Sequence, residues 1–175
     1  MRRIVVTGLG VVSPVGTGRD AFWKGLTAGR SGIGPITLFD AASFPVRIGG
    51  EIRDLDLTEV HATFPAATTV RDRKVLLALA AATEAVRDAR LSLSVLWHAF
   101  LRMGVGLESI CLEGLTRYAG SAELHRTVLD QVATSAHDHW LQTPLDRTAE
   151  ILGARWGLEA GRATNCSACA AGTQV

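Results

Sequence analysis

The chain has 175 residues, of which 47% are hydrophobic and 20% are charged. This composition is ordinary for a soluble globular domain and leaves room for a sizeable core. A net charge of +1 gives no strongly basic surface, which argues against nucleic acid as a partner. No apolar stretch approaches the about 20 residues needed to cross a bilayer, which argues against a membrane protein.

The cysteines and the N-terminus indicate the compartment. The sequence has three cysteines, too few for the disulfide framework of a secreted chain: Cys111, Cys166 and Cys169. The chain starts with basic and then apolar residues, as a signal peptide does, but Gly8 and Gly10 interrupt the apolar run. We therefore expect a cytoplasmic protein whose thiols stay reduced.

The first 50 residues predict a strand, a loop and a helix. Residues 4–6 are Ile-Val-Val, and we expect them to form a buried strand that runs into a glycine loop. Residues 13–18 have turn chemistry, and a helix is predicted over about 19–28, with Gly29 at its C-terminal cap. The segment from 31 to 50 is rich in Gly and Pro, and we expect an ordered connection there with a short strand at 46–48.

The clearest predicted helix covers about residues 71–90. Its apolar residues recur at spacings of three and four: Val75, Leu79, Ala82, Val86 and Ala89. A second core strand is predicted at 103–107, although its glycines weaken it. The region 108–139 is expected to be largely helical.

The last part of the chain predicts a helix followed by a strand. Pro144 can open a helix over 145–156, which Gly157 would end. Residues 162–166 are expected to form a strand, and Cys169 begins a further helical segment. Because strands alternate with helices, the fold class is α/β with an at least partly parallel sheet.

The strongest chemical signal is the segment around Cys169. Small residues flank this cysteine on both sides, in the run Asn165-Cys166-Ser167-Ala168-Cys169-Ala170-Ala171-Gly172. A strand that leads through a tight turn into a helix exposes the residue at the bend and places it near the positive end of the helix dipole. Such a position favours a nucleophilic thiolate, and small neighbours leave space for a substrate.

Three other interpretations of these cysteines stay open on the local pattern. Cys169 can be a small buried core residue, since free cysteine is often buried. Cys166 and Cys169 can form a redox pair at a helix start, although Cys166 falls at the strand end. They can also form half of a zinc site, although the sequence has no second pair at this spacing and Cys111 lacks a nearby ligand.

The segment around Cys169 resembles the nucleophile motif of the β-ketoacyl synthases, where a Thr/Ser-Ala-Cys-Ala-Ser/Ala-Gly run is typical. The opening of the chain, residues 3–16, is similar to the start of that family nearly residue for residue. Further matches are Phe22-Trp23, Ala28-Gly29-Arg30-Ser31-Gly32-Ile33, Phe39-Asp40, Asp72-Arg73 and Ala80-Ala81-Ala82. The resemblance spans most of the chain and strongly favours Cys169 as the nucleophile.

This resemblance implies a thiolase-like fold, layered α/β/α around a mixed sheet, of which residues 1–175 form an incomplete N-terminal domain. It implies a β-ketoacyl-acyl-carrier-protein synthase of fatty acid or polyketide biosynthesis. Cys169 would take an acyl group from acyl carrier protein, and malonyl carrier protein would lose carbon dioxide and attack that thioester. No cofactor is expected apart from the phosphopantetheine of the carrier. The expected assembly is a homodimer, or a heterodimer with another ketosynthase-like chain.

The histidines do not complete this chemistry. The family's two catalytic histidines lie well after the cysteine, whereas six residues follow Cys169 here. We therefore expect a chain that is truncated after its nucleophile and does not complete the reaction alone. All five histidines precede Cys169 and none matches the catalytic pair: His61, His98, His125, His137 and His139. On a helix, His137 and His139 would face apart, so they predict no metal site.

Two segments depart from known patterns. Gly104-Val105-Gly106 stands where the family usually has a Gly-Thr-Gly type sequence. The loop beside the acyl pocket is therefore expected to differ from that of the family. Cys166 is unusual beside the nucleophile, and we expect it to pack in the core. The run Gly8-Leu9-Gly10-Val11-Val12-Ser13 imitates a dinucleotide-binding loop, but Pro14 prevents a helix from opening after it.

Two rival functions come from other classes of protein. One is a non-catalytic partner subunit similar to chain-length factors, which typically lack the cysteine, so that Cys169 argues against it. The other is an inactive fragment, which would leave apolar surface uncovered. A decarboxylative condensing enzyme that uses Cys169 is the function that the sequence favours.

Overall fold

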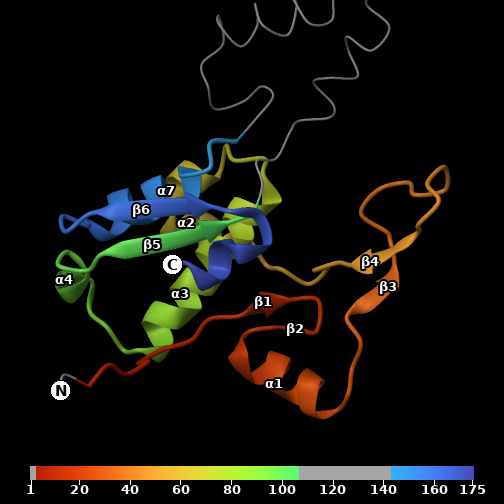
Figure 1. Ribbon diagram of the computed structural model, residues 1–175, viewed down its shortest axis with the longest axis horizontal. Coiled ribbons are helices and arrows are strands. Elements are labelled where there is room, and N and C mark those ends of the chain that lie inside the picture. The colour runs from red at the N-terminus through yellow and green to blue at the C-terminus, as the bar shows by residue number, and fades with distance from the viewer. Residues whose placement is uncertain (1–2, 107–142) are drawn as a thin grey trace, which may run out of the picture. The chain divides into compact units, whose positions relative to one another are not determined.

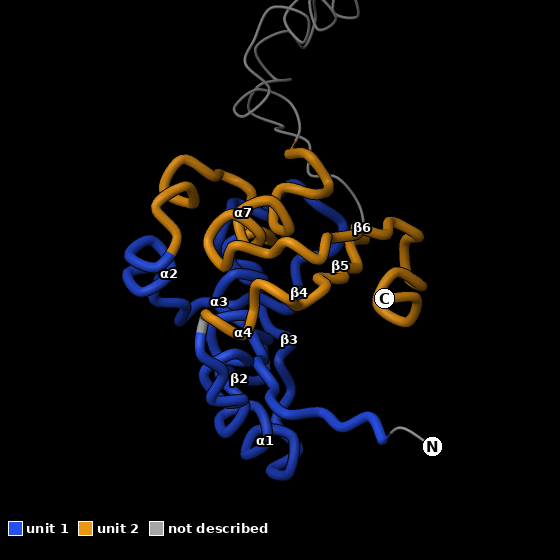
Figure 2. The backbone as a smooth tube through the Cα atoms, turned by 90° about the vertical axis from the view of Figure 1, so that its left-hand side faces the viewer, with its two compact units in different colours: residues 1–63, 76–92 blue, residues 64–75, 93–175 orange. Residues whose placement is uncertain are grey.

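The computed structural model describes residues 3–106 and 143–175, and the helical region predicted within 108–139 lies outside the described residues (Figure 1). The chain divides into two compact units, which Figure 2 shows in different colours. Unit 1 comprises residues 1–63 and 76–92, and unit 2 comprises residues 64–75 and 93–175.

Unit 1 is built from short strands and helices. Its elements in chain order are β1 (Val12–Ser13), β2 (Gly16–Thr17), α1 (Arg19–Thr27), β3 (Ile33–Pro35), β4 (Ile48–Gly50), α2 (Thr58–Thr63) and most of α3 (Arg73–Asp88). β1 pairs with β2, and β3 pairs with β4, both antiparallel. The helices predicted over 19–28 and 71–90 are therefore confirmed as α1 and α3, and the strand predicted at 46–48 lies two residues later as β4.

The end of α1 follows from its glycines. Gly29 takes a left-handed conformation with φ of 64°, which stops the helix one residue after its cap at Ala28. Gly25 is the buried residue of this helix, where it packs closely on Val15. A Cβ at Gly25 would lie 2.6 Å from Cγ1 of Val15. Two large apolar residues of α1 remain exposed, Trp23 at 65% and Leu26 at 46%, whereas Phe22 is half-buried.

The strand predicted at residues 4–6 is wrong for this structure. Ile4 is 96% exposed, and residues 4–6 carry no strand. An extended segment becomes a strand only when another strand pairs with it, and the N-terminal segment instead follows α3. The backbone N–H groups of Leu9 and Val11 donate to the carboxylates of Asp88 at 3.0 Å and Glu84 at 2.8 Å. Side chains of α3 thus take the place of a partner strand.

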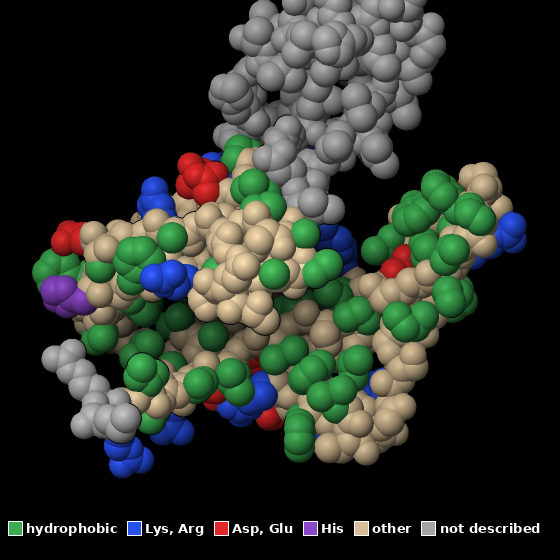
Figure 3. Space-filling model, viewed as in Figure 1, with side chains coloured by type: hydrophobic (Ala, Val, Ile, Leu, Met, Phe, Trp, Pro, Cys, Tyr) green, Lys and Arg blue, Asp and Glu red, His purple; other side chains and the backbone are tan. Residues whose placement is uncertain are grey.

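The β3–β4 pair forms an arm with an apolar surface. Its register aligns Ile33 with Gly50 and Pro35 with Ile48. The rings of Phe39 and Phe44 meet edge to face with centroids 5.7 Å apart. Exposed hydrophobic side chains gather over this arm in Figure 3: Ile33, Leu38, Phe39, Phe44, Val46 and Ile48.

Glu51 fastens this arm and gives it a pH dependence. Its carboxylate accepts the N–H of Leu38 at 2.9 Å, the N–H of Thr37 at 2.8 Å and an ion pair from Arg53 at 3.0 Å. These interactions, that with Leu38 foremost, lower the pKa of Glu51 from 4.5 to about 2. Since the pKa is lower in the folded protein, the stabilisation is complete above the ordinary pKa and is lost as the pH falls toward 2.

We therefore expect Glu51→Gln to lower the melting temperature above pH 5, where the native carboxylate is charged, with a difference that shrinks toward pH 2. Thermal melts of both proteins at several pH values measure this. A difference that is constant from neutral to strongly acid pH would contradict the account. Glu59→Gln is the matched control, since Glu59 is an exposed ion-pair partner of Arg87 in the same unit.

Unit 2 contains the parallel strands. Its elements are η1 (Pro65–Ala67), α4 (Leu93–Leu96), β5 (Leu101–Val105), α7 (Arg147–Trp156), β6 (Arg162–Cys166) and η2 (Ala168–Thr173), together with the first turn of α3. β5 and β6 run parallel, in a register that aligns Leu101 with Arg162 and Val105 with Cys166 (Figure 1). The strand predicted at 162–166 is confirmed residue for residue, and that predicted at 103–107 lies two residues earlier.

The core of unit 2 forms around α7. Leu152 is 1% exposed, and Phe64, also 1% exposed, meets the ring of Trp156 edge to face at 6.3 Å. Gly157 ends α7 with φ of 62°, as the sequence predicts, whereas the helix begins at Arg147, two residues later than expected. α7 packs against both strands of the parallel pair. In sequence it follows β5 and precedes β6.

The described part of the chain is α/β, with two antiparallel pairs and one parallel pair of strands. The strands of this part form three separate pairs, not one continuous mixed sheet. Among the described residues, no helix combines the length and the apolarity required to cross a membrane.

Candidate active site around Cys169

Cys169 follows a sharp bend at the end of β6. Ser167 leaves the strand with φ of −133° and ψ of 44°, and Ala168 then takes φ of 48°. A left-handed conformation is uncommon for a residue with a Cβ and marks a position that its surroundings impose. Cys169 comes next and is exposed, with a free thiol. The predicted sequence of strand, tight turn and helical segment is therefore confirmed.

The helical segment differs from expectation in type. η2 is a 3-10 helix of six residues, Ala168–Thr173. The contribution of a helix dipole to the thiol, expected from the sequence, needs the aligned peptide units of a longer α-helix and finds no support in η2. What the structure does show is that Cys169 is exposed next to the bend.

The backbone of η2 rests directly on β5. A Cβ at Gly104 would lie 2.7 Å from the carbonyl oxygen of Ala171 and 3.0 Å from the N of Gly172. Ala171 is 2% exposed, so it is the buried anchor of η2. The glycine in the unusual segment 104–106 therefore has a clear role, because it lets the turn that carries Cys169 approach the sheet.

Side chains at the two ends of the turn also meet. The side-chain oxygen of Gln174 accepts hydrogen bonds from Nδ2 of Asn165 at 2.6 Å and from the hydroxyl of Ser167 at 2.5 Å. Sequence reasoning missed Gln174, because a glutamine five positions after a cysteine carries no pattern of its own. Only the fold shows that its side chain returns to β6.

Cys166 corrects one prediction, and Cys169 excludes one alternative, that of a buried core residue. It is exposed, and its thiol donates to the carbonyl of Gly106 at 3.2 Å, so the expected packing in the core is wrong. Cys166 is the last residue of β6 and aligns with Val105, the last residue of β5; Val105 is buried, whereas Cys166 is exposed. Cys169 is not a buried core residue either. Cys166 and Cys169 are both free thiols, and no group of three or more metal-ligating side chains occurs among the described residues.

The described histidines are far from Cys169 in the sequence and do not belong to β6 or η2. His61 belongs to α2, and the ring of His98 lies 4.0 Å from that of Trp97 beside α4. His125, His137 and His139 lie outside the described residues. The expectation that no histidine here acts with Cys169 stays a prediction.

The glycine loop of residues 8–13 packs against a helix. A Cβ at Gly10 would overlap the backbone of Ala81 and lie 2.8 Å from the N of Ala85, and one at Gly8 would lie 2.6 Å from the N of Ala89. These glycines therefore serve close packing on α3, and a dinucleotide has no space there. No helix opens directly after the loop, because β1 and β2 come before α1, as expected from Pro14.

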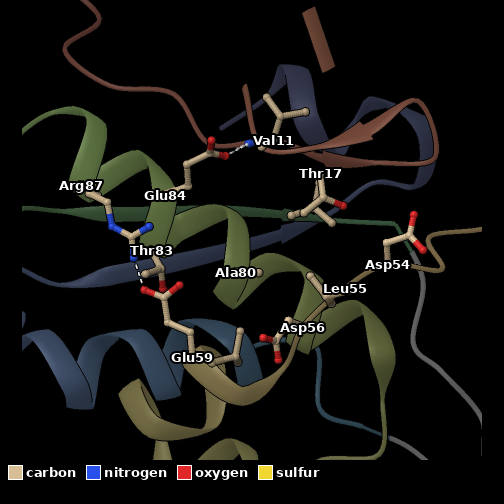
Figure 4. Close-up of a pocket in the computed structure, with 13 residues that line it drawn as sticks. Val11, Thr17, Asp54, Leu55, Asp56, Glu59, Ala80, Thr83, Glu84 and Arg87 are labelled. Carbon is tan, nitrogen blue, oxygen red and sulfur yellow. Dashed lines mark hydrogen bonds and ion pairs between the residues drawn. The ribbon is translucent and has the colours of Figure 1, made fainter. Parts of the chain in front are cut away.

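A pocket of about 290 Å³ lies beside this loop, within unit 1 (Figure 4). Most of the charged side chains that line the pocket form hydrogen bonds or ion pairs with other residues of unit 1. Glu84 accepts the N–H groups of Val11 and Arg19, the latter at 2.7 Å, and Arg87 pairs with Glu59. These side chains are engaged within unit 1, so we assign no ligand to the pocket.

The fold and the bend define a class of protein. An α/β chain that presents a free, exposed cysteine at a strained turn after a parallel strand is arranged like the N-terminal portion of a thiolase-like enzyme. The model of the family "Beta-ketoacyl synthase, N-terminal domain" matches residues 1–175. The chain therefore belongs to the β-ketoacyl synthase family.

Individual relatives agree with this assignment. The chain is 42% identical over 95 residues to 3-oxoacyl-[acyl-carrier-protein] synthase 2 of Synechocystis sp., a match that covers 54% of this chain and 22% of that protein. It is 39% identical over 123 residues to the tetracenomycin polyketide synthase ketoacyl synthase alpha subunit of Streptomyces glaucescens, covering 70% of this chain and 28% of the relative.

Two solved structures have the same fold. The ishigamide ketosynthase/chain length factor superposes with a TM-score of 0.62 at 26% identity, over 93% of this chain and 39% of that one. A β-ketoacyl synthase from Burkholderia phymatum STM815 superposes with a TM-score of 0.71 at 21% identity, over 99% of this chain and 41% of the other. The chain thus spans well under two thirds of the length of the relatives that it matches, and the thiolase-like fold is confirmed.

Proposed function

We propose that the protein is a β-ketoacyl-acyl-carrier-protein synthase whose acyl acceptor is Cys169. The observation that carries this proposal is the free, exposed thiol directly after the left-handed Ala168, at the end of a parallel strand. Membership of the β-ketoacyl synthase family supports it. The presence of the cysteine disfavours a non-catalytic partner subunit.

The first half-reaction transfers an acyl group to the cysteine. The sulfur of Cys169 attacks the carbonyl carbon of an acyl thioester, and the oxyanion takes hydrogen bonds from backbone N–H groups, including that of Cys169. The carbon–sulfur bond to the carrier breaks, and the released thiolate takes up the proton that Cys169 lost. The acyl group is then held as a thioester on Cys169.

The second half-reaction forms the carbon–carbon bond. A malonyl thioester loses carbon dioxide, and the electron pair of the broken bond becomes an enolate. The enolate carbon attacks the acyl carbonyl on Cys169, and the bond from that carbon to sulfur breaks. The product is a β-ketoacyl thioester on the carrier, and Cys169 is regenerated as a thiolate.

The partners in this proposal follow from the chemistry and from the relatives. Acyl and malonyl groups arrive on acyl carrier protein, and the phosphopantetheine of that carrier is the only cofactor that the reaction draws on. Some relatives are named as alpha and beta subunits of polyketide ketosynthases. We therefore propose a second ketosynthase-like chain, identical or related, as partner. A cytoplasmic location fits the free thiols of Cys166 and Cys169.

Acylation of Cys169 is tested with the protein expressed from its complete reading frame. Short, medium and long acyl thioesters of phosphopantetheine are added, and the intact mass and the modified peptide are determined. We expect one acyl group on Cys169, no acylation in Cys169→Ala, and unchanged acylation in the matched variant Cys166→Ala. Acylation that persists in Cys169→Ala would refute the assignment of the nucleophile.

Condensation is tested separately by adding malonyl carrier protein to the acylated enzyme. We expect release of carbon dioxide together with a β-ketoacyl product, and no β-ketoacyl product from Cys169→Ala, which has no thiol to hold the acyl group. A protein that takes the acyl group but never forms the product would limit the proposal to the first half-reaction.

A further inference from the structure

Gln174 joins the two ends of the segment that carries Cys169. Its Oε1 accepts from Nδ2 of Asn165 at 2.6 Å and from the hydroxyl of Ser167 at 2.5 Å. Asn165 belongs to β6, whereas Gln174 directly follows η2. One side-chain oxygen therefore fixes the strand end and the first residue of the bend at the same time.

These two bonds bracket the strained residue. Ser167 directly precedes Ala168, whose φ of 48° is a conformation that residues with a Cβ adopt only when their surroundings impose it. Inside the turn, the N–H of Ala170 donates to the carbonyl of Ser167 at 3.1 Å, which links neighbours in sequence. The Gln174 bonds add a link from the far end of η2 back to β6.

We propose that Gln174 is a positioning residue for Cys169, which holds the bend so that the thiol points toward an incoming thioester. This inference rests on the proposed acyl transfer to Cys169. Gln174 touches neither the sulfur nor the substrate in this role. It acts through Ser167 and Asn165, and it requires an acceptor oxygen at the reach of a glutamine side chain.

The requirement for an acceptor oxygen defines the variants. Gln174→Leu keeps a similar volume but has no acceptor, whereas Gln174→Glu keeps an oxygen at the same reach. Thr173→Val is the matched control, because the Thr173 hydroxyl donates to the carbonyl of Ala170 at 2.9 Å within η2 and does not connect to β6. The rate of acyl transfer to Cys169 is measured by intact mass at several thioester concentrations, in the protein from the complete reading frame.

We expect Gln174→Leu to slow the saturated rate of acyl transfer by about tenfold, the size expected when two hydrogen bonds that orient a reacting group are lost. The concentration of thioester at half-saturation stays the same, because Gln174 does not bind it. Gln174→Glu stays within about threefold of native, and Thr173→Val keeps the native rate.

Ser167→Ala removes one of the two donors to this oxygen and leaves Gln174 in place, so the slower acyl transfer expected of it keeps the inference falsifiable if Gln174→Leu proves unstable. In a double-mutant cycle, we expect the variant that carries both changes to be no slower than Gln174→Leu alone, since Gln174→Leu already removes the hydrogen bond that Ser167→Ala breaks. A native rate in Gln174→Leu, an equal loss in Gln174→Glu, or strictly additive losses in the cycle would each overturn the positioning role. Acylation that persists in Cys169→Ala would instead overturn the proposed function, so the two failures are distinguishable.

Discussion

Gly104→Ala is expected to slow acylation of Cys169 by about 100-fold, because a catalytic group misplaced by about 1 Å loses a rate factor of that order. A Cβ at this position would lie 2.7 Å from the carbonyl oxygen of Ala171 and 2.8 Å from its carbonyl carbon. Both atoms are backbone, so no side chain can rotate away. Relief requires η2 to move off β5, and Cys169 moves with it.

The same substitution is expected to lower the free energy of unfolding by about 1–3 kcal/mol, the usual cost of an extra methyl group in a well-packed contact. Ala171 is the buried anchor of η2, at 2% exposure, so the contact has little room to relax. Denaturant unfolding followed by circular dichroism measures the loss of stability, and intact-mass kinetics measure the acylation rate.

Gly106→Ala is the matched control, two residues further along the same segment. Among the residues that the structure describes, none has an atom within 4 Å of a Cβ at Gly106, and Gly106 does not take a positive φ. We expect native stability and a native acylation rate in this variant. If Gly104→Ala and Gly106→Ala behave alike, close packing of η2 on β5 is not what places Cys169.

Gly10→Ala is expected to destabilise the protein by about 1–3 kcal/mol, or about 2–4 °C in melting temperature for each kcal/mol. A Cβ there would overlap the backbone of Ala81 in α3. The segment would have to lift away from the helix, and the N–H of Val11 would then lose its acceptor at Glu84, now 2.8 Å away. Thermal melts of native and variant protein measure the effect.

Leu9→Ala is the control for this position, because Leu9 lies between the two packed glycines and is 52% exposed. Removing an exposed side chain changes stability little, so we expect a melting temperature close to native. A Gly10→Ala variant as stable as Leu9→Ala would show that the glycine loop does not pack closely on α3.

Sequence reasoning predicted well where the signal was local. The helices α1 and α7 end at Gly29 and Gly157, whose left-handed φ values are the ones that glycine adopts without cost. The periodic apolar stripe predicted α3, and its buried residues include Val75 and Leu79 from that stripe. The bend before Cys169 was predicted because small residues follow a β-prone run.

Predictions failed where the answer depended on a distant partner. Residues 4–6 have the composition of a buried strand, yet the segment is exposed, because α3 carboxylates rather than a second strand take up the neighbouring backbone N–H groups. Cys166 was expected in the core, yet the register of β6 on β5 leaves it exposed beside Gly106. Neither outcome leaves a trace in the local sequence.

By itself, the sequence determined the family, the cysteine at the bend and the helices whose ends glycines mark, because propensity and turn chemistry act between near neighbours. Tertiary structure alone decided which glycine packs against η2 and which side chains replace a partner strand. It also decided that Gln174 accepts hydrogen bonds from Asn165 and Ser167. Those outcomes depend on distances between residues far apart in the chain. Such distances are fixed only when the strands pair and the helices pack.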